Sequence, residues 1–597
     1  MLSRIVDFLP FETSPLVFLL MALIFLIFLF FALRLHKWLA LIMFFGMITQ
    51  SLTTIKSGLL YSYGMGFWGP NGHDGVWHLA LINELTYHFP PQNMVFANFP
   101  LSNYHWLFDF FLAFFHKITF IPVINLYFQI FPIVFSGFLG ILTFILVKKI
   151  TKNNLSAFLA VFFIYFGGSF GWLVTLLRGQ ELGGESMFWA NQSISFSLNM
   201  QFFLSLILMI YGFYLYLNYL EKSSWKKFYL LIFVFGLIIG IKAYGGIIIL
   251  FGLGATTFWE LITKKKPKTL KVFLGSLVIS LLIFLPNNLA SSSLFVFSPL
   301  WLPHTMVDFA DRFGWLRLGQ ARQAYFATGN WLKWFLAESL TLFIFFVGNL
   351  GMRVIGIRKL FFWWKNWKKI DSFQILFIGC LLISGFVPLL FIQKGNPWNS
   401  IQFFYYFLVF FGLMASWGMG EFLAKKRIWL KVIFISLVVL MTLPTTIGSL
   451  KHYLSYQPPA KISFDELEGL NFLKNRSPGI VLAYPHDYKA RENTEGPKPL
   501  YIYETTAYVS AFANQQTFLE DEMNLEIMGV DWRPRRVKVE EFFKTKDIDQ
   551  AKKFLEENEI KYLYLINGQE FKVDQLQLSL NKIFENDLVK IFQKNDE

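Results

Sequence analysis

The sequence predicts an α-helical polytopic membrane protein with about 12 transmembrane helices and a small C-terminal α/β domain outside the cytoplasm. Of its 597 residues, 55% are hydrophobic and only 15% are charged, whereas soluble domains carry about 25% charged residues. Apolar runs of membrane-crossing length recur up to Leu450, and the composition then changes. This composition argues against a soluble protein, a disordered chain and a coiled coil, and the single cysteine, Cys380, excludes a disulfide-stapled domain.

The apolar runs define the predicted spans, because a helix needs about 20 apolar residues to cross roughly 30 Å of hydrocarbon. The first run lacks a small-residue cleavage pattern, so we expect a retained helix and not a signal peptide. Runs 228–241 and 272–286 are the shortest and could instead be partly buried helices. The predicted spans are 15–33, 38–55, 123–147, 155–177, 198–220, 228–241, 243–262, 272–286, 335–350, 373–392, 403–422 and 431–447.

Basic clusters predict the orientation of the chain. Six clusters hold 23 of the 53 Lys and Arg residues and fall on alternate connections, as cytoplasmic loops should. They are Arg34/Lys37, Lys148/Lys149/Lys152, Lys222/Lys226/Lys227, Lys264 to Lys271, Arg353 to Lys369 and Lys425 to Lys431. The outer side then receives 56–122, 178–197, 287–334, 393–402 and everything after 450. The net charge of +14 therefore orients the chain in the plasma membrane and does not indicate nucleic acid.

Two domains follow from this pattern. Residues 1–450 form the transmembrane domain, in which 56–122 is the first outer loop and carries two surface helices. Residues 451–597 hold 20 basic and 25 acidic side chains and no run of spanning length, so they form a soluble extracytoplasmic domain. Two helix-then-strand patterns there, DELEGLNFLKN before GIVLAYP and DIDQAKKFLEENE before IKYLYLI, predict its α/β class.

The first outer loop holds the candidate catalytic residues, since five of the nine histidines fall within it. Asp74 and His78 are four residues apart, as are His105 and Asp109, so each pair shares one face of a helix. Two such helices would converge on a polar pocket above the bilayer. Alternatively, Asp74 is only a helix N-cap and the histidines only satisfy the membrane interface. A divalent metal on Asp74, His78 and His105 is a further option, although the spacing matches no recognised ligand motif.

The order of features in this loop resembles the GT-C membrane glycosyltransferases, in particular the protein mannosyltransferase and aminoarabinose transferase branches. The resemblance covers about Asn71 to Pro132 and is carried by HDGVWHLALINEL, the Pro90-Pro91 turn and NYHWLFDFFLAFF. It implies a GT-C-like fold, a polyprenyl-phosphate-linked sugar donor on the outer face, and Asp74 as the general base. Gly75 stands where several branches have a second acid, and Phe99-Pro100-Leu101 lacks the lysine of the aminoarabinose branch. The resemblance therefore does not name the donor or the acceptor.

A phosphate-linked donor needs cations near the outer face. Lys242 lies in GIKAYGG between two apolar runs, where a charge costs ~2.5–3.5 kcal/mol if it reaches the bilayer centre. Alternatively, Lys242 only snorkels from a tight outer hairpin towards the membrane surface. Arg317 and Arg322 lie in an aromatic, cationic stretch of 287–334, which is either an interfacial helix that gates donor entry or a helix on the headgroups.

The sequence thus predicts a glycosyltransferase that moves a sugar to a glycan, lipid or protein acceptor, with no cofactor. Asp74 is the expected base, with His73, His78, His105 and Asp109 assisting, in a pocket dry enough to strengthen an aspartate. A transporter or flippase is the first alternative, but ten of the 14 acids before residue 451 lie outside the inner loops, whereas transport favours ionisable groups in mid-membrane. A receptor or scaffold is the second, and it leaves the His/Asp cluster without a purpose.

Overall fold

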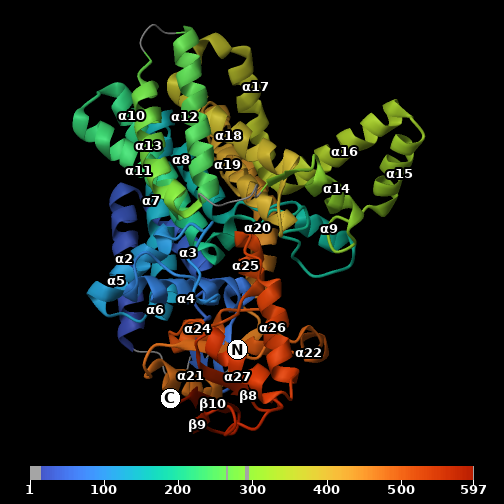
Figure 1. Ribbon diagram of the computed structural model, residues 1–597. Coiled ribbons are helices and arrows are strands. Elements are labelled where there is room, and N and C mark those ends of the chain that lie inside the picture. Colours follow the sequence, from blue (N-terminus) through green and yellow to red (C-terminus); the bar gives the residue numbers. More distant parts are fainter. Residues whose placement is uncertain (1–14, 264–266, 289–294, 596–597) are drawn as a thin grey trace.

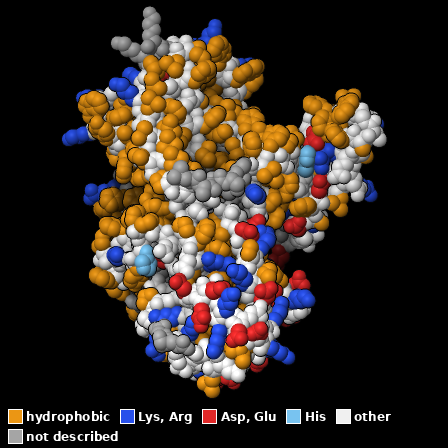
Figure 2. All heavy atoms as spheres, viewed as in Figure 1, with side chains coloured by type: hydrophobic (Ala, Val, Ile, Leu, Met, Phe, Trp, Pro, Cys, Tyr) orange, Lys and Arg blue, Asp and Glu red, His pale blue; other side chains and the backbone are white. Residues whose placement is uncertain are grey.

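The structure is a computed structural model that describes residues 15–263, 267–288 and 295–595. Lys264 to Lys266 of the fourth basic cluster and part of the loop 287–334 lie outside the described residues. A long helical part is followed by a small C-terminal domain at one end of it (Figure 1). Hydrophobic side chains cover the helical part, whereas charged side chains crowd the C-terminal domain (Figure 2). The predicted class, a multi-pass helical membrane protein with a small α/β domain, is confirmed.

Each of the predicted spans coincides with a helix. Among the described residues, nine helical stretches are long and apolar enough to cross a membrane, or ten if the pair α8–α9, bent by 52°, is one span. Besides this pair, α3 and α11, with 16 and 17 residues, are the shortest helices that coincide with predicted spans. The helices are α2 (Pro15–Leu35), α3 (Lys37–Leu52), α7 (Phe131–Thr151), α8 (Asn154–Phe166), α9 (Gly171–Leu177), α10 (Met200–Glu221), α11 (Trp225–Ile241), α12 (Ala243–Thr263), α13 (Thr269–Asn288), α16 (Trp331–Leu350), α18 (Ser372–Leu390), α19 (Gln402–Ala424) and α20 (Ile428–Tyr453).

The predicted basic loops meet one another at one end of the bundle. Lys149 pairs with Glu221 at 2.7 Å, and Lys359 pairs with Glu421 at 2.7 Å. The first contact joins the C-terminal end of α7 to that of α10. The second joins the connection after α16 to the C-terminal end of α19. The short elements at this end are η4 (Gly351–Gly356), α17 (Ile357–Lys365) and η5 (Trp367–Lys369).

The segment 56–122 lies at the opposite end. It forms β1 (Leu59–Tyr61), β2 (Gly64–Phe67), η1 (Gly69–Gly72), α4 (Asp74–Tyr87) and α5 (Leu107–Thr119), and α6 (Val123–Asn125) with the π-turn η2 (Leu126–Ile130) leads into α7. With 13 residues, or about 20 Å, α5 is too short to cross a membrane. The structure differs from two surface helices in one respect: α4 is buried along almost its whole length, because the C-terminal domain packs over it.

A projection leaves the bundle on one side (Figure 1). It consists of α14 (Trp301–Asp308), α15 (Leu316–Ala327) and the adjoining part of α16. At its base, β3 (Phe295–Phe297) pairs antiparallel with β4 (Phe391–Gln393), and η6 (Pro397–Ile401) leads into α19. The remaining short helix of the membrane part is η3 (Ser193–Leu198), before α10.

The C-terminal domain has a mixed four-stranded sheet of order β6-β8-β10-β9, in which β6 and β8 are parallel and the rest antiparallel. The two parallel strands are those of the predicted helix-then-strand units. Its strands are β6 (Ile480–Ala483), β8 (Ile560–Ile566), β9 (Leu580–Glu585) and β10 (Val589–Lys594). Its helices are α21 (Phe464–Lys474), α22 (Tyr488–Asn493), α23 (Leu500–Tyr503), α24 (Tyr508–Ala513), α25 (Glu522–Met528), α26 (Arg533–Lys544) and α27 (Ile548–Glu557).

A second sheet joins the two parts of the chain. Its order is β1-β2-β5-β7, with β5 (Ala460–Ile462) and β7 (Lys498–Pro499) from the C-terminal domain. Because β2 pairs with β5 over Met65 to Phe67, the outer segment and the C-terminal domain share backbone hydrogen bonds. The two therefore lie on the same side of the bundle.

Candidate active site

A cavity of about 260 Å³ lies where the bundle, the outer segment and the C-terminal domain meet. Five of the predicted site residues line it: His73, Asp74, His78, His105 and Lys242. The C-terminal domain contributes the side of α25 that carries Met523, Asn524 and Ile527. The cavity thus draws its walls from segments that are hundreds of residues apart in the sequence.

Asp74 is the acid most open to this cavity, with 55% of its side chain exposed. It is the first residue of α4, and His73 holds the N-cap position without a side-chain capping bond. The N-cap alternative for Asp74 therefore does not apply, although a carboxylate in the first turn still gains from the helix dipole. Its Oδ1 lies 2.8 Å from His73 Nδ1, and Oδ2 has no hydrogen-bond partner in the described part of the chain.

His73 links Asp74 to the C-terminal domain. Its Nε2 lies 3.2 Å from Oδ1 of Asp521, so the imidazole bridges two carboxylates. Burial alone would lower the pKa of His73, but Asp521 and then Asp74 hold that pKa well above 6.5. Burial acts to raise the pKa of Asp74, yet the hydrogen bond and charge of His73, with His78 and Lys242, hold it below 3.8. Asp74 is thus an ionised carboxylate beside an imidazolium.

A second histidine–aspartate pair lies one helical turn further along α4. His78 Nδ1 is 2.9 Å from Oδ1 of Asp109, a fully buried residue of α5. Gln201 Nε2 lies 2.8 Å from His78 Nδ1 and 2.7 Å from His78 Nε2, so the amide of α10 contacts both ring nitrogens. Burial raises the pKa of Asp109 above 3.8, although His78 opposes the shift.

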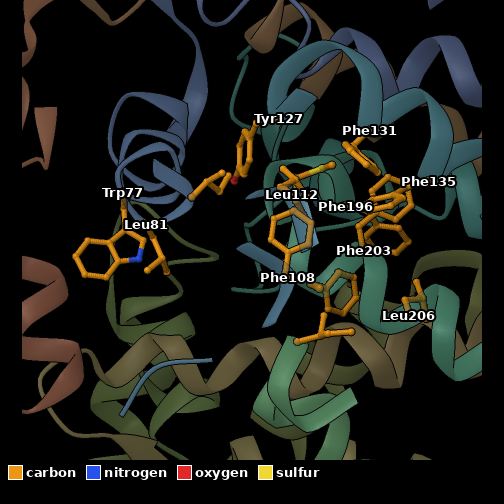
Figure 3. Packing of buried hydrophobic residues seen from close by; sticks show 14 of the residues in the cluster. Trp77, Leu81, Phe108, Leu112, Tyr127, Phe131, Phe135, Phe196, Phe203 and Leu206 are labelled. Atoms are coloured by element: carbon orange, nitrogen blue, oxygen red, sulfur yellow. The ribbon is translucent and has the colours of Figure 1, made fainter. Parts of the chain in front are cut away.

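Aromatic packing holds this second pair in place. The π-turn before α7 sets Tyr127 against His78, with the rings 5.7 Å apart and nearly parallel. Figure 3 shows Phe108 and Leu112, which flank Asp109 on α5, among the rings of α7 and α10. The ring centroids of Phe108 and Phe135 are 6.3 Å apart. Since these side chains have little room to move, the His78–Asp109 pair is rigid.

His105 lies just before α5 and therefore not on its helical stripe, because α5 begins only at Leu107. Its ring stacks on Tyr104 at 4.8 Å, and its buried Nε2 has no partner among the described residues. Burial, and then the charges of Lys242 and His78, lower its pKa well below 6.5, so His105 is neutral. It can hydrogen-bond a ligand in the cavity without bringing charge.

Lys242 supplies the cation of the cavity. It occupies the one-residue break between α11 and α12 with an extended backbone, and it is only 5% exposed. A lysine that snorkels would extend its ammonium into water, so the burial of Lys242 argues against that alternative. Its Nζ lies 5.3 Å from the ring of Tyr244, and no carboxylate of the described chain lies within ion-pair distance. An ammonium buried without a counterion is a site for an anion.

Amide side chains line the cavity beside Lys242 and Tyr244. Tyr244 donates to Gln393 Oε1 at 2.7 Å, and Asn399 donates to the same oxygen at 2.8 Å. Gln402 bonds to Asn399 and accepts from Asn199 at 3.3 Å. These neutral donors and acceptors can bind hydroxyl groups.

The other two predicted phosphate-binding residues lie elsewhere. Arg317 is exposed on α15 and does not line the cavity. Arg322 is buried in the projection, where it pairs with Asp308 at 3.0 Å and with Glu338 at 3.5 Å. The described part of the chain contains no cluster of three or more His, Cys, Asp or Glu side chains that could hold a metal ion.

Asp521 is the site residue that the sequence pattern did not reveal. It lies 448 residues from His73, in a domain without a recognisable motif. The pairs expected from helical spacing also differ from those formed: His73 joins Asp74, and His78 joins Asp109. Contacts between elements, and not spacing within one helix, decide the pairing.

No family model and no curated protein matches this chain. Among solved structures, it is similar to the archaeal oligosaccharyltransferase AglB from Archaeoglobus fulgidus in complex with an inhibitory peptide and a dolichol-phosphate, with 13% identity, a TM-score of 0.46, and coverage of 89% of this chain and 69% of that chain. The apo form of the oligosaccharyltransferase of that organism is 12% identical, with a TM-score of 0.48 and coverage of 89% of this chain and 70% of that chain. The arabinofuranosyltransferase AftD from Mycobacteria is 12% identical, with a TM-score of 0.47, and the match covers 94% of this chain but only 40% of that chain.

Both neighbours transfer sugars by name, as do the families that residues 71–132 resemble. Identities and TM-scores at this level do not establish the activity of this chain. Its function is therefore argued from its own site.

Proposed function

We propose that this protein is a membrane glycosyltransferase that uses a polyprenyl-phosphate-linked sugar. The observation that carries the proposal is one cavity at the end of a membrane bundle that holds both an ionised carboxylate, Asp74, and a buried ammonium, Lys242, which has no counterion among the described residues. A carboxylate and a cation on one small cavity match a reaction in which one group loses a proton and another leaves as an anion. The place of the cavity, beside membrane helices and below a soluble domain, suits a lipid-linked donor and a hydrophilic acceptor.

In this mechanism, an acceptor hydroxyl attacks the anomeric carbon of the donor. The new bond joins the acceptor oxygen to that carbon, the bond from the carbon to the phosphate oxygen breaks, and both of its electrons leave with the phosphate. Asp74 Oδ2 takes the hydroxyl proton, and Lys242 stabilises the polyprenyl phosphate. A low pKa is compatible with this role, because the attacking hydroxyl becomes acidic as its bond forms.

The neighbouring groups bind the sugar and orient the catalytic carboxylate. Neutral His105 lines the cavity and can hydrogen-bond a sugar hydroxyl without bringing charge, and the amides of Gln393 and Asn399 bind further hydroxyls. His73 holds Asp74, while the His78–Asp109 pair supports the floor of the cavity. The acceptor, a glycan, a lipid or a protein, enters from the side of the C-terminal domain.

A turnover assay tests the proposal. The purified full-length protein in nanodiscs is given a panel of polyprenyl-phosphate-linked hexoses and pentoses, and the release of free polyprenyl phosphate is measured with and without glycan acceptors. We expect release by the wild type and a loss of about 10²–10⁴-fold in Asp74→Asn. The matched control is Asp531→Asn, since Asp531 is exposed in the C-terminal domain. Equal turnover by Asp74→Asn, or no turnover of any donor, overturns the assignment.

The proposal also places the site on the extracytoplasmic face of the plasma membrane, on the strength of the basic loops at the opposite end. The only cysteine, Cys380, is buried, so introduced cysteines can be labelled selectively. Leu576→Cys, at a position 75% exposed in the C-terminal domain, should react with a membrane-impermeant maleimide in intact cells. Lys425→Cys, in the loop after α19, should react only after permeabilisation. The reverse pattern contradicts the orientation.

A further inference from the structure

The segment of the C-terminal domain that ends at Asp521 is attached to the outer segment by backbone hydrogen bonds. Thr517 N donates to Met94 O at 2.9 Å, and Ala97 N donates to Thr517 O at 3.0 Å. Glu520 N donates to Val95 O at 2.9 Å. The residue before Asp521 is therefore fixed to the chain that follows α4, and Asp521 is placed by both domains.

Local contacts also hold the side chain of Asp521. Its backbone lies in the left-handed region with φ +44°, and the residue is the N-cap of α25. Asn524 donates to both of its oxygens, from N at 3.1 Å and from Nδ2 at 2.8 Å. The carboxylate is almost fully buried, and His73 Nε2 is its remaining partner at 3.2 Å. A buried carboxylate that is held in one orientation toward His73 points to a role at this contact.

We propose that Asp521 is a positioning residue of the transfer site, through which the C-terminal domain holds His73 and thereby aims Asp74 into the cavity. The inference rests on the proposed function for the meaning of Asp74. The contact from Asp521 to His73 to Asp74 stands independently of the reaction. The C-terminal domain is, in this arrangement, part of the active site and not only a docking module.

The physical argument follows from the two nitrogens of His73. With carboxylates on both sides, the doubly protonated ring donates from Nδ1 to Asp74 and from Nε2 to Asp521. Without the charge of Asp521, burial favours the neutral ring, which keeps a single N–H. If that proton stays on Nε2, the lone pair of Nδ1 faces Asp74 and repels it. Asp74 then loses the bond that sets its rotamer.

The charged and titratable groups around this contact come from several elements. Asp74 and Asp521 act directly on His73, and His78 and Lys242 act on Asp74. Tyr503 of α23 packs against Gly72, next to His73, and stays neutral because burial raises its pKa to about 12. Asp521 and Asp74 are thus the anions that keep His73 charged.

Histidine C2-hydrogen exchange followed by mass spectrometry tests the contact in the full-length protein, because it reports the titration of individual histidines without any substrate. We expect the exchange midpoint of His73 to fall by at least about one pH unit in Asp521→Asn. It should stay unchanged in Asp531→Asn, and His304, on the projection, serves as an internal reference. An unchanged His73 midpoint in Asp521→Asn overturns the inference, whatever the activity of the protein.

If Asp521→Asn does not yield folded protein, Asn524→Ala keeps all the charges but removes the side-chain bond from Nδ2 to Asp521, while the backbone N–H of residue 524 still donates to it. We expect a smaller shift of the His73 midpoint in the same direction, and no shift at all overturns the inference. In the turnover assay, kcat should fall by about 10–10²-fold in Asp521→Asn with little change in KM. Asp521→Glu should recover part of the loss, whereas a structural defect would not depend on charge. If Asp74→Asn turns over normally, the proposed function fails, while the His73 titration still decides the contact.

Discussion

Two histidine–aspartate pairs on neighbouring turns of α4 have opposite surroundings. The His73–Asp74 pair faces the cavity, with Asp74 55% exposed, and its third member comes from the C-terminal domain. The His78–Asp109 pair is far less exposed: His78 also borders the cavity but its side chain is only 7% exposed, and Asp109 is fully buried. The same two residue types therefore serve different purposes: the open pair presents an ionised carboxylate to a ligand, and the closed pair stabilises the structure.

Exchange of each acid for its amide tests this division most strongly. Asp74→Asn removes the base, for an expected loss of about 10²–10⁴-fold in turnover. Asp109→Asn keeps an oxygen that can accept from His78, so we expect a loss of only about tenfold, through position alone. The initial rate of polyprenyl phosphate release measures both. Equal losses in the two variants would show that the pairs act as one unit.

Lys242 tests whether the open pair faces an anion site. In Lys242→Gln, we expect turnover to fall by about 10²-fold, because the leaving phosphate loses its cation. Competitive inhibition by free polyprenyl phosphate should weaken in parallel. Lys117→Gln changes an exposed lysine at the end of α5 and is the matched control. Unaltered inhibition in Lys242→Gln would remove Lys242 from the donor site.

The order of the two pairs should reverse when stability is measured instead of turnover, so that loss of Asp109 has the larger effect. Asp109→Ala leaves buried His78 without its partner, and we expect it to lower the free energy of unfolding by about 1–3 kcal/mol. Asp74→Ala should cost less than about 1 kcal/mol, since solvent screens an acid that is more than half exposed. Thermal unfolding in detergent, followed by tryptophan fluorescence, compares them. A larger loss in Asp74→Ala would contradict the assignment of the closed pair to stability.

The pH dependence of stability gives the smallest effect. Because the pKa of His73 is raised above 6.5, its contribution is fully present below pH 6.5 and is lost as the pH rises through the folded value. Asp74, with a pKa below 3.8, contributes above pH 3.8 and loses this contribution only as the pH falls through its folded value. The unfolding temperature should therefore decrease from pH 6.5 towards alkaline pH, and less so in His73→Gln. The same decrease in both proteins would exclude His73 as its source.

Much of the architecture was predictable from the sequence. Apolar runs of spanning length predicted each membrane helix, because hydrocarbon requires a continuous apolar surface and internal hydrogen bonds. The two helix-then-strand units of the C-terminal domain were legible for the same local reason. Apolar runs alone do not fix the number of spans, since α3 is only 16 residues long and α8 bends into α9.

The site was only partly predictable. The histidines and acids of the first outer loop drew attention by their density, and Lys242 by its charge in an apolar run. Helical spacing suggested pairs within single helices, but α4 and α5 pack together and exchange partners. Arg322 illustrates the opposite case, because its charge is already matched by Asp308 and Glu338 in the projection.

By itself, the sequence determined a membrane protein of many helices, the loop that carries the chemistry and the charge pattern that orients the chain, because each depends on residues close together along the chain. Only the tertiary structure decided which of these residues meet. It buried α4 under the C-terminal domain, placed Lys242 in the cavity without a counterion from the described part of the chain, and brought Asp521 to His73 across 448 residues. Such contacts arise from packing and hydrogen bonds between distant segments, which no local pattern records.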